Sequence, residues 1–162
     1  MTSIGNLTVF LALAAAVYAT AASVYGGLRR RHDFVASGEH AALAVWGLVM
    51  IATGIMLYAL ATHDFSLKYV AGYSSTTLPM QYRLAALWGG MEGSLLFWVL
   101  ILMTMTAIAI WQNRNKNREL MPFVTATCMI VAAFFLALLV FVTPPFAELP
   151  FVAAEGSDLN PL

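Results

Sequence analysis

The hydrophobic positions of this 162-residue chain fall into four long runs, which three more polar segments separate and a mixed tail follows. Each run is long enough to cross a membrane as a helix, which takes about 20 apolar residues at 1.5 Å of rise each. None of the runs shows the strict alternation of a barrel strand, so helices are the remaining interpretation. The pattern predicts an all-α integral membrane protein whose four transmembrane helices pack as a bundle.

The same pattern sets the boundaries of the segments. We expect helices at residues 1–28, 40–62, 84–112 and 121–143, loops at residues 29–39, 63–83 and 113–120, and a final segment at residues 144–162. Pro79 argues against helix at its position and sets the entry to the third helix. The double proline Pro144-Pro145 ends the fourth helix. Alternating apolar and polar residues after it favour a segment lying on a surface, with a frayed terminus as the alternative.

Charged residues indicate the orientation of the helices. Six of the eight Lys and Arg residues lie in the loops at 29–39 and 113–120, against Lys68 and Arg83 in the loop between them. By the positive-inside rule the two basic loops face the cytoplasm, so both chain ends lie outside (N-out, C-out). The first run lacks a positive charge before it, unlike a secretory signal, and we interpret it as a retained helix.

Composition agrees with a membrane protein. Hydrophobic residues make up 61% of the chain and charged residues 10%, against about 45–50% and about 25% in soluble domains. The net charge of zero gives no indication of a nucleic-acid partner, and membrane lipid is the expected surrounding. Cys128 is the only cysteine and lies in an apolar run, so we expect a small core residue and no disulfide or cysteine metal site.

Small residues recur at helical spacing in three of the runs. Residues 12, 16, 19, 23 and 26 are Ala, Ser or Gly and form one stripe of the first helix, Gly47 and Gly54 are seven apart in the second, and Gly89 and Gly93 are four apart in the third. Such spacing lets helix backbones approach closely. It predicts packing within the bundle, or docking against further helices.

The three histidines do not form a haem or metal site by their placement. His32 and His40 lie at the cytoplasmic side and His63 lies at the opposite end of the second run, so none is in mid-membrane. Each is most simply a polar boundary residue, with His63 the best exception because it shares the outer side with the aromatic loop and the tail. We predict no metal site and no catalytic residue, since no nucleophile–base pair or phosphate loop is present.

Glu92 is the ionisable residue that calls for an explanation. It lies about two turns into the expected third helix, in the stretch WGGMEGSLLFW at residues 88–98. A carboxylate at membrane depth must pair or be protonated, and is a functional-site hypothesis by default. Trp88, four residues earlier, would share its face, and Arg83 is a possible salt partner. Structural pairing and contact with a ligand or partner both remain open.

Several short motifs, taken in order, are similar to those of one family. They are IGN at residues 4–6, DFSLKYVA at 64–71, LP at 78–79, YR at 82–83, WG at 88–89, EGSLL at 92–96, Trp98, PF at 145–146, EG at 155–156 and DLNPL at 158–162. In this order, and on the expected sides of four helices, they resemble the N-terminal part of the CcmF/NrfE family of cytochrome c-type biogenesis haem lyases.

The resemblance implies a function in cytochrome c maturation at the periplasmic face of a bacterial inner membrane. Family members receive haem from a periplasmic haem chaperone and attach its vinyl groups to the CxxCH thiols of apocytochrome c. They work with thiol-reducing and apocytochrome-holding lyase subunits. The cofactor would be haem b, held against a tryptophan-rich WWD segment and ligated by periplasmic histidines.

The haem-ligating residues of the family have no counterpart here. The family's periplasmic histidine follows the DLNPL element and the WWD segment lies further on, whereas this chain ends at Leu162. We therefore expect a truncated product or one subunit of a split lyase, with haem bound through residues outside this chain. None of the three histidines receives a haem-ligand role, because none occupies the matching position.

The resemblance places the candidate site at the outer ends of the helices. The third helix would begin the haem-handling module, and the candidate residues of its cavity wall are Trp88, Gly89, Glu92, Gly93, Ser94 and Trp98. In the outer loop and tail the candidates are His63, Tyr82, Arg83, Asp158 and Asn160. The expected function is that of a subunit or N-terminal fragment of the haem lyase. The alternatives are a non-catalytic membrane scaffold and a small transporter subunit, although the mid-helix polar residues, mostly Thr and Ser, favour a scaffold over a transporter.

Overall fold

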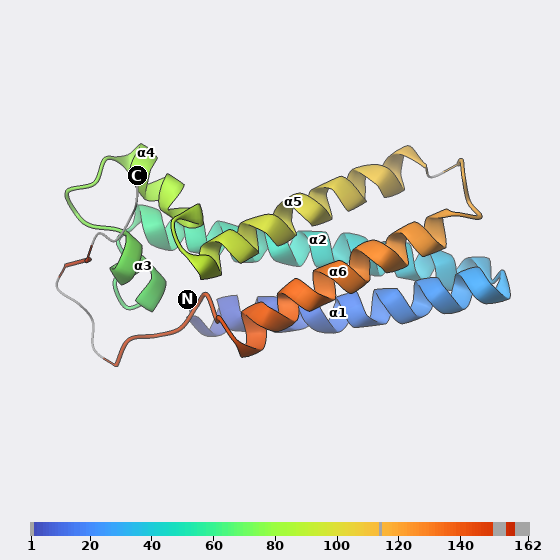
Figure 1. Ribbon diagram of the computed structural model, residues 1–162, viewed down its shortest axis with the longest axis horizontal. Coiled ribbons are helices and arrows are strands. Elements are labelled where there is room, and N and C mark those ends of the chain that lie inside the picture. Colours follow the sequence, from blue (N-terminus) through green and yellow to red (C-terminus); the bar gives the residue numbers. More distant parts are fainter. Residues whose placement is uncertain (1, 114, 151–154, 158–162) are drawn as a thin grey trace.

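Four long helices run side by side in the computed structural model, which describes residues 2–113, 115–150 and 155–157 (Figure 1). They are α1 (Thr2–Arg29), α2 (His32–Ala61), α5 (Met91–Gln112) and α6 (Met121–Phe141). Three short elements lie between α2 and α5: α3 (Lys68–Tyr73), α4 (Met80–Ala85) and the 3-10 helix η1 (Ala86–Trp88). All four long helices are long and apolar enough to cross a membrane, which agrees with the four predicted spans.

The four helices form a ring in the order α1, α2, α5, α6, and α2 also contacts α6 across it. The contact between α1 and α2 depends on small residues. A Cβ added at Gly26 would lie 2.7 Å from the backbone nitrogen of Val35, and one added at Gly38 would overlap the Ser23 hydroxyl. The predicted stripe on α1 is therefore confirmed, since its five residues are buried against neighbouring helices.

The glycine pair on α2 does not pack within the bundle. A Cβ added at Gly47 or Gly54 would meet no atom within 4 Å, so both positions border open space. Packing inside the described part of the chain does not account for this pair.

The second helix begins earlier than its hydrophobic run. It starts at His32 instead of residue 40, because the polar residues of its first two turns, Asp33, Ser37 and Glu39 among them, are compatible with helix outside the apolar region. The turn between α1 and α2 is consequently only two residues, Arg30 and Arg31, and Arg30 adopts a left-handed conformation with φ 51°.

The third span begins later than predicted. Residues 84–90 do not continue α5 but form the end of α4, the turn η1 and an extended Gly90 with φ −125° and ψ 170°. The predicted helix over residues 84–112 is therefore wrong at its start, and α5 begins at Met91. Pro79 directly precedes α4, so the helix that it introduces is a short one of its own.

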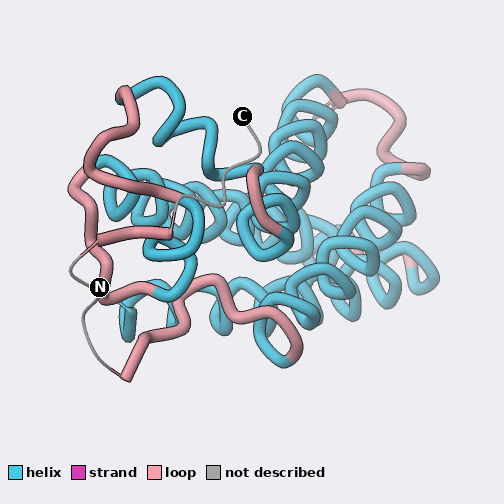
Figure 2. The backbone as a smooth tube through the Cα atoms, turned by 60° about the vertical axis from the view of Figure 1, so that its left-hand side comes forward, coloured by secondary structure: helices cyan, strands magenta, loops and turns pink. Residues whose placement is uncertain are grey.

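One end of the bundle carries a folded cap, which we define as residues 62–90, 143–150 and 155–157. Figures 1 and 2 show α3, α4 and the segment after α6 gathered at this end. An isolated antiparallel bridge joins Leu67 to Glu148, with hydrogen bonds from Lys68 N to Ala147 O (2.9 Å) and from Leu149 N to Ser66 O (3.0 Å). The part of the tail that the structure describes therefore lies on the loop that follows α2, whereas residues 151–154 and 158–162 of the predicted surface segment lie outside the described residues.

The chain after α6 is also fixed to the start of α1. The ring of Phe146 is fully buried and fills the space beside Gly5, where an added Cβ would lie 2.6 Å from the ring. The side-chain amide of Asn6 donates to the Phe146 carbonyl at 3.4 Å. Two motifs that are 140 residues apart in sequence, IGN and PF, thus meet in one contact.

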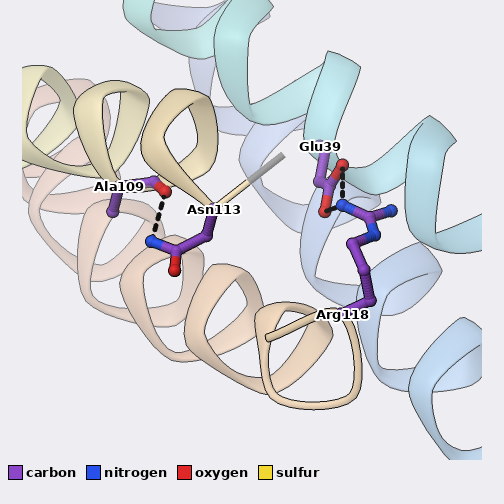
Figure 3. A network of polar contacts seen from close by, with 4 residues as sticks. All are labelled: Glu39, Ala109, Asn113 and Arg118. Atoms are coloured by element: carbon purple, nitrogen blue, oxygen red, sulfur yellow. Dashed lines mark hydrogen bonds and ion pairs between the residues drawn. The ribbon is translucent and has the colours of Figure 1, made fainter. Parts of the chain in front are cut away.

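The opposite end of the bundle, the basic end, consists of residues 29–40, 113 and 115–120. An ion pair joins the segment before α6 to α2: Arg118 donates to the Glu39 carboxylate at 2.8 Å and 3.1 Å (Figure 3). The Asn113 side chain caps the end of α5 by donating to the Ala109 carbonyl at 2.9 Å (Figure 3).

Candidate functional site

The phenol of Tyr69 joins α3 to the backbone that leads into α5. Its hydroxyl lies within donating distance of two carbonyls, Ala86 O (2.8 Å) and Leu87 O (3.1 Å), and accepts from Gly90 N at 3.1 Å. All of these groups are buried. The hydroxyl thereby satisfies backbone groups left open where the helix is interrupted between η1 and α5.

Glycines at residues 90 and 93 make room for the two tyrosines of α3. A Cβ at Gly90 would lie 2.5 Å from the Tyr73 ring, and one at Gly93 would overlap the Leu87 carbonyl and the Tyr69 hydroxyl. Gly93 therefore does allow a close approach, as predicted. The groups that approach it are the preceding turn and the Tyr69 side chain, and not a neighbouring long helix. Gly89 ends η1 in a helical conformation with φ −70°.

Burial raises the pKa of the Tyr69 phenol well above its ordinary value of 10.0, and the nearby Glu92 carboxylate and the Tyr73 phenol raise it further. The hydrogen bond from the Gly90 backbone acts in the opposite direction and does not compensate. At neutral pH the phenol therefore keeps its proton and remains a donor to the carbonyls.

Glu92 lies in the first turn of α5, at the rim of the cap, and not two turns inside a helix. Because the chain is interrupted at Gly90, Trp88 does not share a helix face with Glu92, and the ring of Trp88 instead lies 5.8 Å from that of Phe97. Arg83 is not its salt partner either, since Arg83 bonds to His63 and Ala61. A carboxylate in the first turn of a helix is favoured by the helix dipole.

A groove of about 480 Å³ opens beside Glu92 in the cap. From α3, Lys68, Tyr69 and Tyr73 line it. Ala147 and Leu149 of the chain after α6, and Glu155 to Ser157 of the tail, also line it. The groove therefore combines aromatic and aliphatic walls with one lysine and two carboxylates, a composition suited to a ligand with apolar and charged parts.

His63 and Arg83 meet at the base of the cap. The Arg83 guanidinium donates to His63 Nε2 at 2.7 Å and to the Ala61 carbonyl at 3.1 Å. Because arginine has no acceptor, His63 Nε2 must be the unprotonated nitrogen. Two atoms of the pair, His63 Nδ1 and Arg83 Nε, are buried without a hydrogen-bond partner in the part of the chain that the structure describes.

The remaining candidate residues are spread around this site. Ser94 donates to the Trp88 carbonyl at 3.0 Å and so closes the turn before α5. Trp98 is two-thirds exposed on the outside of α5, and Tyr82 is exposed on α4. Asp158 and Asn160 lie outside the described residues. The structure thus brings Glu92, Gly93 and Ser94 together at the start of α5 and places Trp98 on the bundle surface.

Glu155 fastens the tail to the cap. Its carboxylate accepts from Thr76 N at 2.8 Å and from the Thr76 hydroxyl at 2.7 Å. These two hydrogen bonds lower the pKa of Glu155 below its ordinary value of 4.5. Next to it, Ser157 N donates to the Ala71 carbonyl at 2.7 Å.

The described residues contain no group of three or more His, Cys, Asp or Glu side chains that could hold a metal ion. His63, the histidine of the cap, has one ring nitrogen bonded to Arg83 and the other buried. It therefore does not fit the role of an axial haem ligand in this arrangement.

Several known proteins with related sequences are described as cytochrome c-type biogenesis proteins. This chain is 38% identical over 167 residues to "Cytochrome c-type biogenesis protein CcmF" of Escherichia coli, which covers the whole chain and 25% of that protein. It is 34% identical to CcmF of Pseudomonas aeruginosa over 98% of the chain and 24% of the relative. With the "Probable cytochrome c-type biogenesis protein NrfE" of Escherichia coli it shares 39% identity over 74% of the chain and 22% of the relative.

The fold agrees with these sequences. The solved structure of "Cytochrome c Heme Lyase CcmF" matches 90% of this chain with a TM-score of 0.80 at 26% identity. This chain belongs to the CcmF/NrfE family. No family model matches the sequence.

Family membership and four membrane-crossing helices together identify a multi-pass membrane protein. The chain spans about a quarter of the length of the curated CcmF relatives that it matches. Of the solved CcmF structure it covers 24%.

Two residues that hold the cap together, Tyr69 and Phe146, were not among the candidate residues predicted from the sequence. Both lie in motifs that carry the family resemblance, DFSLKYVA and PF, so the motifs contained the signal. Their contacts with Gly90, Gly93 and Gly5 join segments far apart in sequence, and a pattern of hydrophobic positions does not pair such segments.

Proposed function

We propose that this chain is a membrane-spanning part of a cytochrome c haem lyase, and that its cap forms part of the wall of the site where haem meets apocytochrome c. The cap would face the periplasm across a bacterial inner membrane. The complete lyase would catalyse the joining of haem vinyl groups to the CxxCH thiols of the apocytochrome.

The observation that carries this proposal is the convergence of the shared motifs. Several motifs that resemble the family meet in pairs at this end: Asn6 of IGN bonds to Phe146 of PF, and Tyr69 of DFSLKYVA packs against Gly93 of EGSLL. A Cβ added at Gly156 of EG would lie 3.1 Å from the Phe65 ring of DFSLKYVA. Apart from Trp98, the described motifs lie in the cap or in the helical turns next to it. This placement favours a working surface at the cap over a scaffold alone.

In this proposal haem iron is ligated outside the described residues of this chain. The chain's own residues would position and shield the haem. Tyr69 fixes the entry to α5, and Tyr73, Leu149 and Lys68 offer apolar and cationic surface at the groove. Apolar surface suits a porphyrin face and a lysine suits its carboxylates. Haem b is the form that the family resemblance implies.

The partners proposed for the chain are the remainder or another subunit of the lyase that carries the WWD segment, a periplasmic haem chaperone, the thiol-reducing and apocytochrome-holding subunits, and apocytochrome c. Purification of the tagged chain from its native membranes, followed by a reduced-minus-oxidised haem spectrum, tests this set. A haem band accompanied by a larger membrane protein supports the proposal. A haem band from this chain alone would contradict the placement of the ligands elsewhere.

Glu92 gives a sharper test, because it lines the groove from the first turn of α5. In a strain with the complete lyase, we expect Glu92→Ala to lower the yield of holocytochrome c, measured by covalent haem staining. Its membrane level should stay normal. Glu148→Ala is the matched control, since Glu148 is an exposed carboxylate of the same cap that does not line the groove. Normal yield from a stably inserted Glu92→Ala variant would remove Glu92 from the site.

A further inference from the structure

The groove at the basic end of the bundle has no part in the proposed haem function. It has a volume of about 500 Å³ and lies between the turn that joins α1 to α2 and the start of α6. We propose that this groove binds the headgroup of an anionic phospholipid.

The groove has an apolar wall and a polar wall, which match the acyl chain and the headgroup of a lipid. Leu28, Leu120 and Phe123 line it and leave much of their apolar surface exposed at the ends of membrane-spanning helices. Arg30 and His32 line its polar part. A free phosphate would use only the polar part, whereas a phospholipid would also cover the apolar wall with its acyl chain.

The charge around the groove favours an anion. Residues 29–40, 113 and 115–120 contain five Lys and Arg residues against three Asp and Glu residues. Arg118, which also lines the groove, is neutralised by Glu39, and Glu119 contributes one opposing carboxylate. Arg30 has no such ion pair in the described part of the chain, so it is the cation that we assign to the lipid phosphate.

The backbone at Arg30 supports a role for this side chain. With φ 51° it adopts a left-handed conformation that suits Gly or Asn better than arginine. We take this departure from the usual backbone preference as support for a use of the Arg30 charge. In addition, α2 begins directly at the groove with His32, and its N-cap residue Arg31 provides no side-chain cap, so a phosphate there would face the positive end of the helix dipole.

The position of the groove agrees with the level of lipid headgroups. It lies where four apolar helices end, and by the positive-inside rule this is the cytoplasmic leaflet, in which anionic lipids give a negative surface potential. The groove would thus anchor the end of the bundle opposite to the cap.

The test compares lipid retention by the purified full chain in native mass spectrometry. Phosphatidylglycerol and phosphatidylcholine of identical acyl chains are added in equal amounts. We expect phosphatidylglycerol to be retained preferentially. Arg30→Gly should lower that preference about fivefold, the effect of about one cation at a membrane surface. The variant should fold normally, because glycine is the favoured residue at this φ.

Two controls make the outcome decisive. Lys116→Ala removes an exposed cation of the same end that does not line the groove, and should leave the preference unchanged. Arg30→Asn, which also tolerates a left-handed φ, should reproduce the loss seen with Arg30→Gly. Equal retention of the two lipids, or an Arg30→Gly variant that keeps the wild-type preference, would overturn the proposal. Displacement of the lipid by glycerol 3-phosphate at equal concentration would overturn the assignment to a lipid in favour of a free phosphate.

Discussion

The hydroxyl of Tyr69 and the missing side chain of Gly93 depend on each other. The hydroxyl bonds to the Ala86 carbonyl and to Gly90 N, 17 and 21 residues away in sequence, and it occupies the space that a Cβ at Gly93 would need. One buried phenol can satisfy these groups only if residue 93 is glycine. The contact therefore fixes how α5 leaves the cap, and with it the position of Glu92.

Gly93→Ala should consequently destabilise the protein by about 1–3 kcal/mol, because the new methyl group would overlap a backbone carbonyl as well as the phenol. The measurement is the thermal unfolding midpoint in detergent. Gly54→Ala is the matched control, since its methyl group meets open space and alanine is the better helix former. Equal midpoints for the two variants would contradict the assigned role of Gly93.

The sequence indicates which residue types are unusual at a position, but not which residues contact one another. Glu92 and Gly93 could be predicted as candidates, because a carboxylate and a small residue are conspicuous in an apolar run. Tyr69 could not, because a tyrosine at the edge of a membrane segment is ordinary and nothing local indicates which backbone groups its hydroxyl will meet. The partner proposed for Glu92, Arg83, was wrong for the same reason: its guanidinium turns to His63.

Among the elements, the interruption before α5 explains the largest departure from the predicted boundaries. Residues 84–112 are continuous in hydropathy, so composition alone predicts one helix. The chain is interrupted because Gly90 is extended and because Tyr69 supplies the hydrogen bonds that the lost helical turn would have provided. The four long spans themselves were predictable, because apolar length is a property of the sequence alone.

The link between the tail and the loop at Thr76 should depend on pH. Hydrogen bonds from Thr76 lower the pKa of Glu155, so the folded state favours the carboxylate. Its stabilising contribution is present above the ordinary value of 4.5 and is lost as the pH falls through the lower pKa of the folded state. We expect the Thr76 amide to exchange hydrogen faster, after correction for intrinsic rates, once the pH falls below that folded-state value.

Glu155→Ala should produce the same fast exchange at neutral pH, because it removes both acceptor oxygens from Thr76. Glu148→Ala serves as the control, since the bridge at that residue uses backbone groups and its side chain is exposed. An exchange rate at Thr76 that is unchanged by Glu155→Ala would show that the tail is held by the bonds of Ser157 instead.

For the molecule as a whole, the asymmetry between its two ends is the main structural result. The cap combines shared family motifs with a groove, whereas the basic end as defined carries five of the eight Lys and Arg residues. If the cap faces the periplasm, the haem proposal and the positive-inside rule agree. If it faces the cytoplasm, both fail together, since cytochrome c maturation would then lack its site on the correct side.

Labelling of single cysteines decides between these orientations. Cys128, the only native cysteine, lies within α6 and is first replaced by serine. In that background, Thr76→Cys in the cap should react with a membrane-impermeant maleimide applied to the periplasmic side of intact cells. Asn115→Cys at the basic end should react only after the inner membrane is permeabilised. Both positions are exposed, so a difference in labelling reports the side of the membrane and not burial. The reverse result would mean that charge in the loops does not determine the topology of this chain.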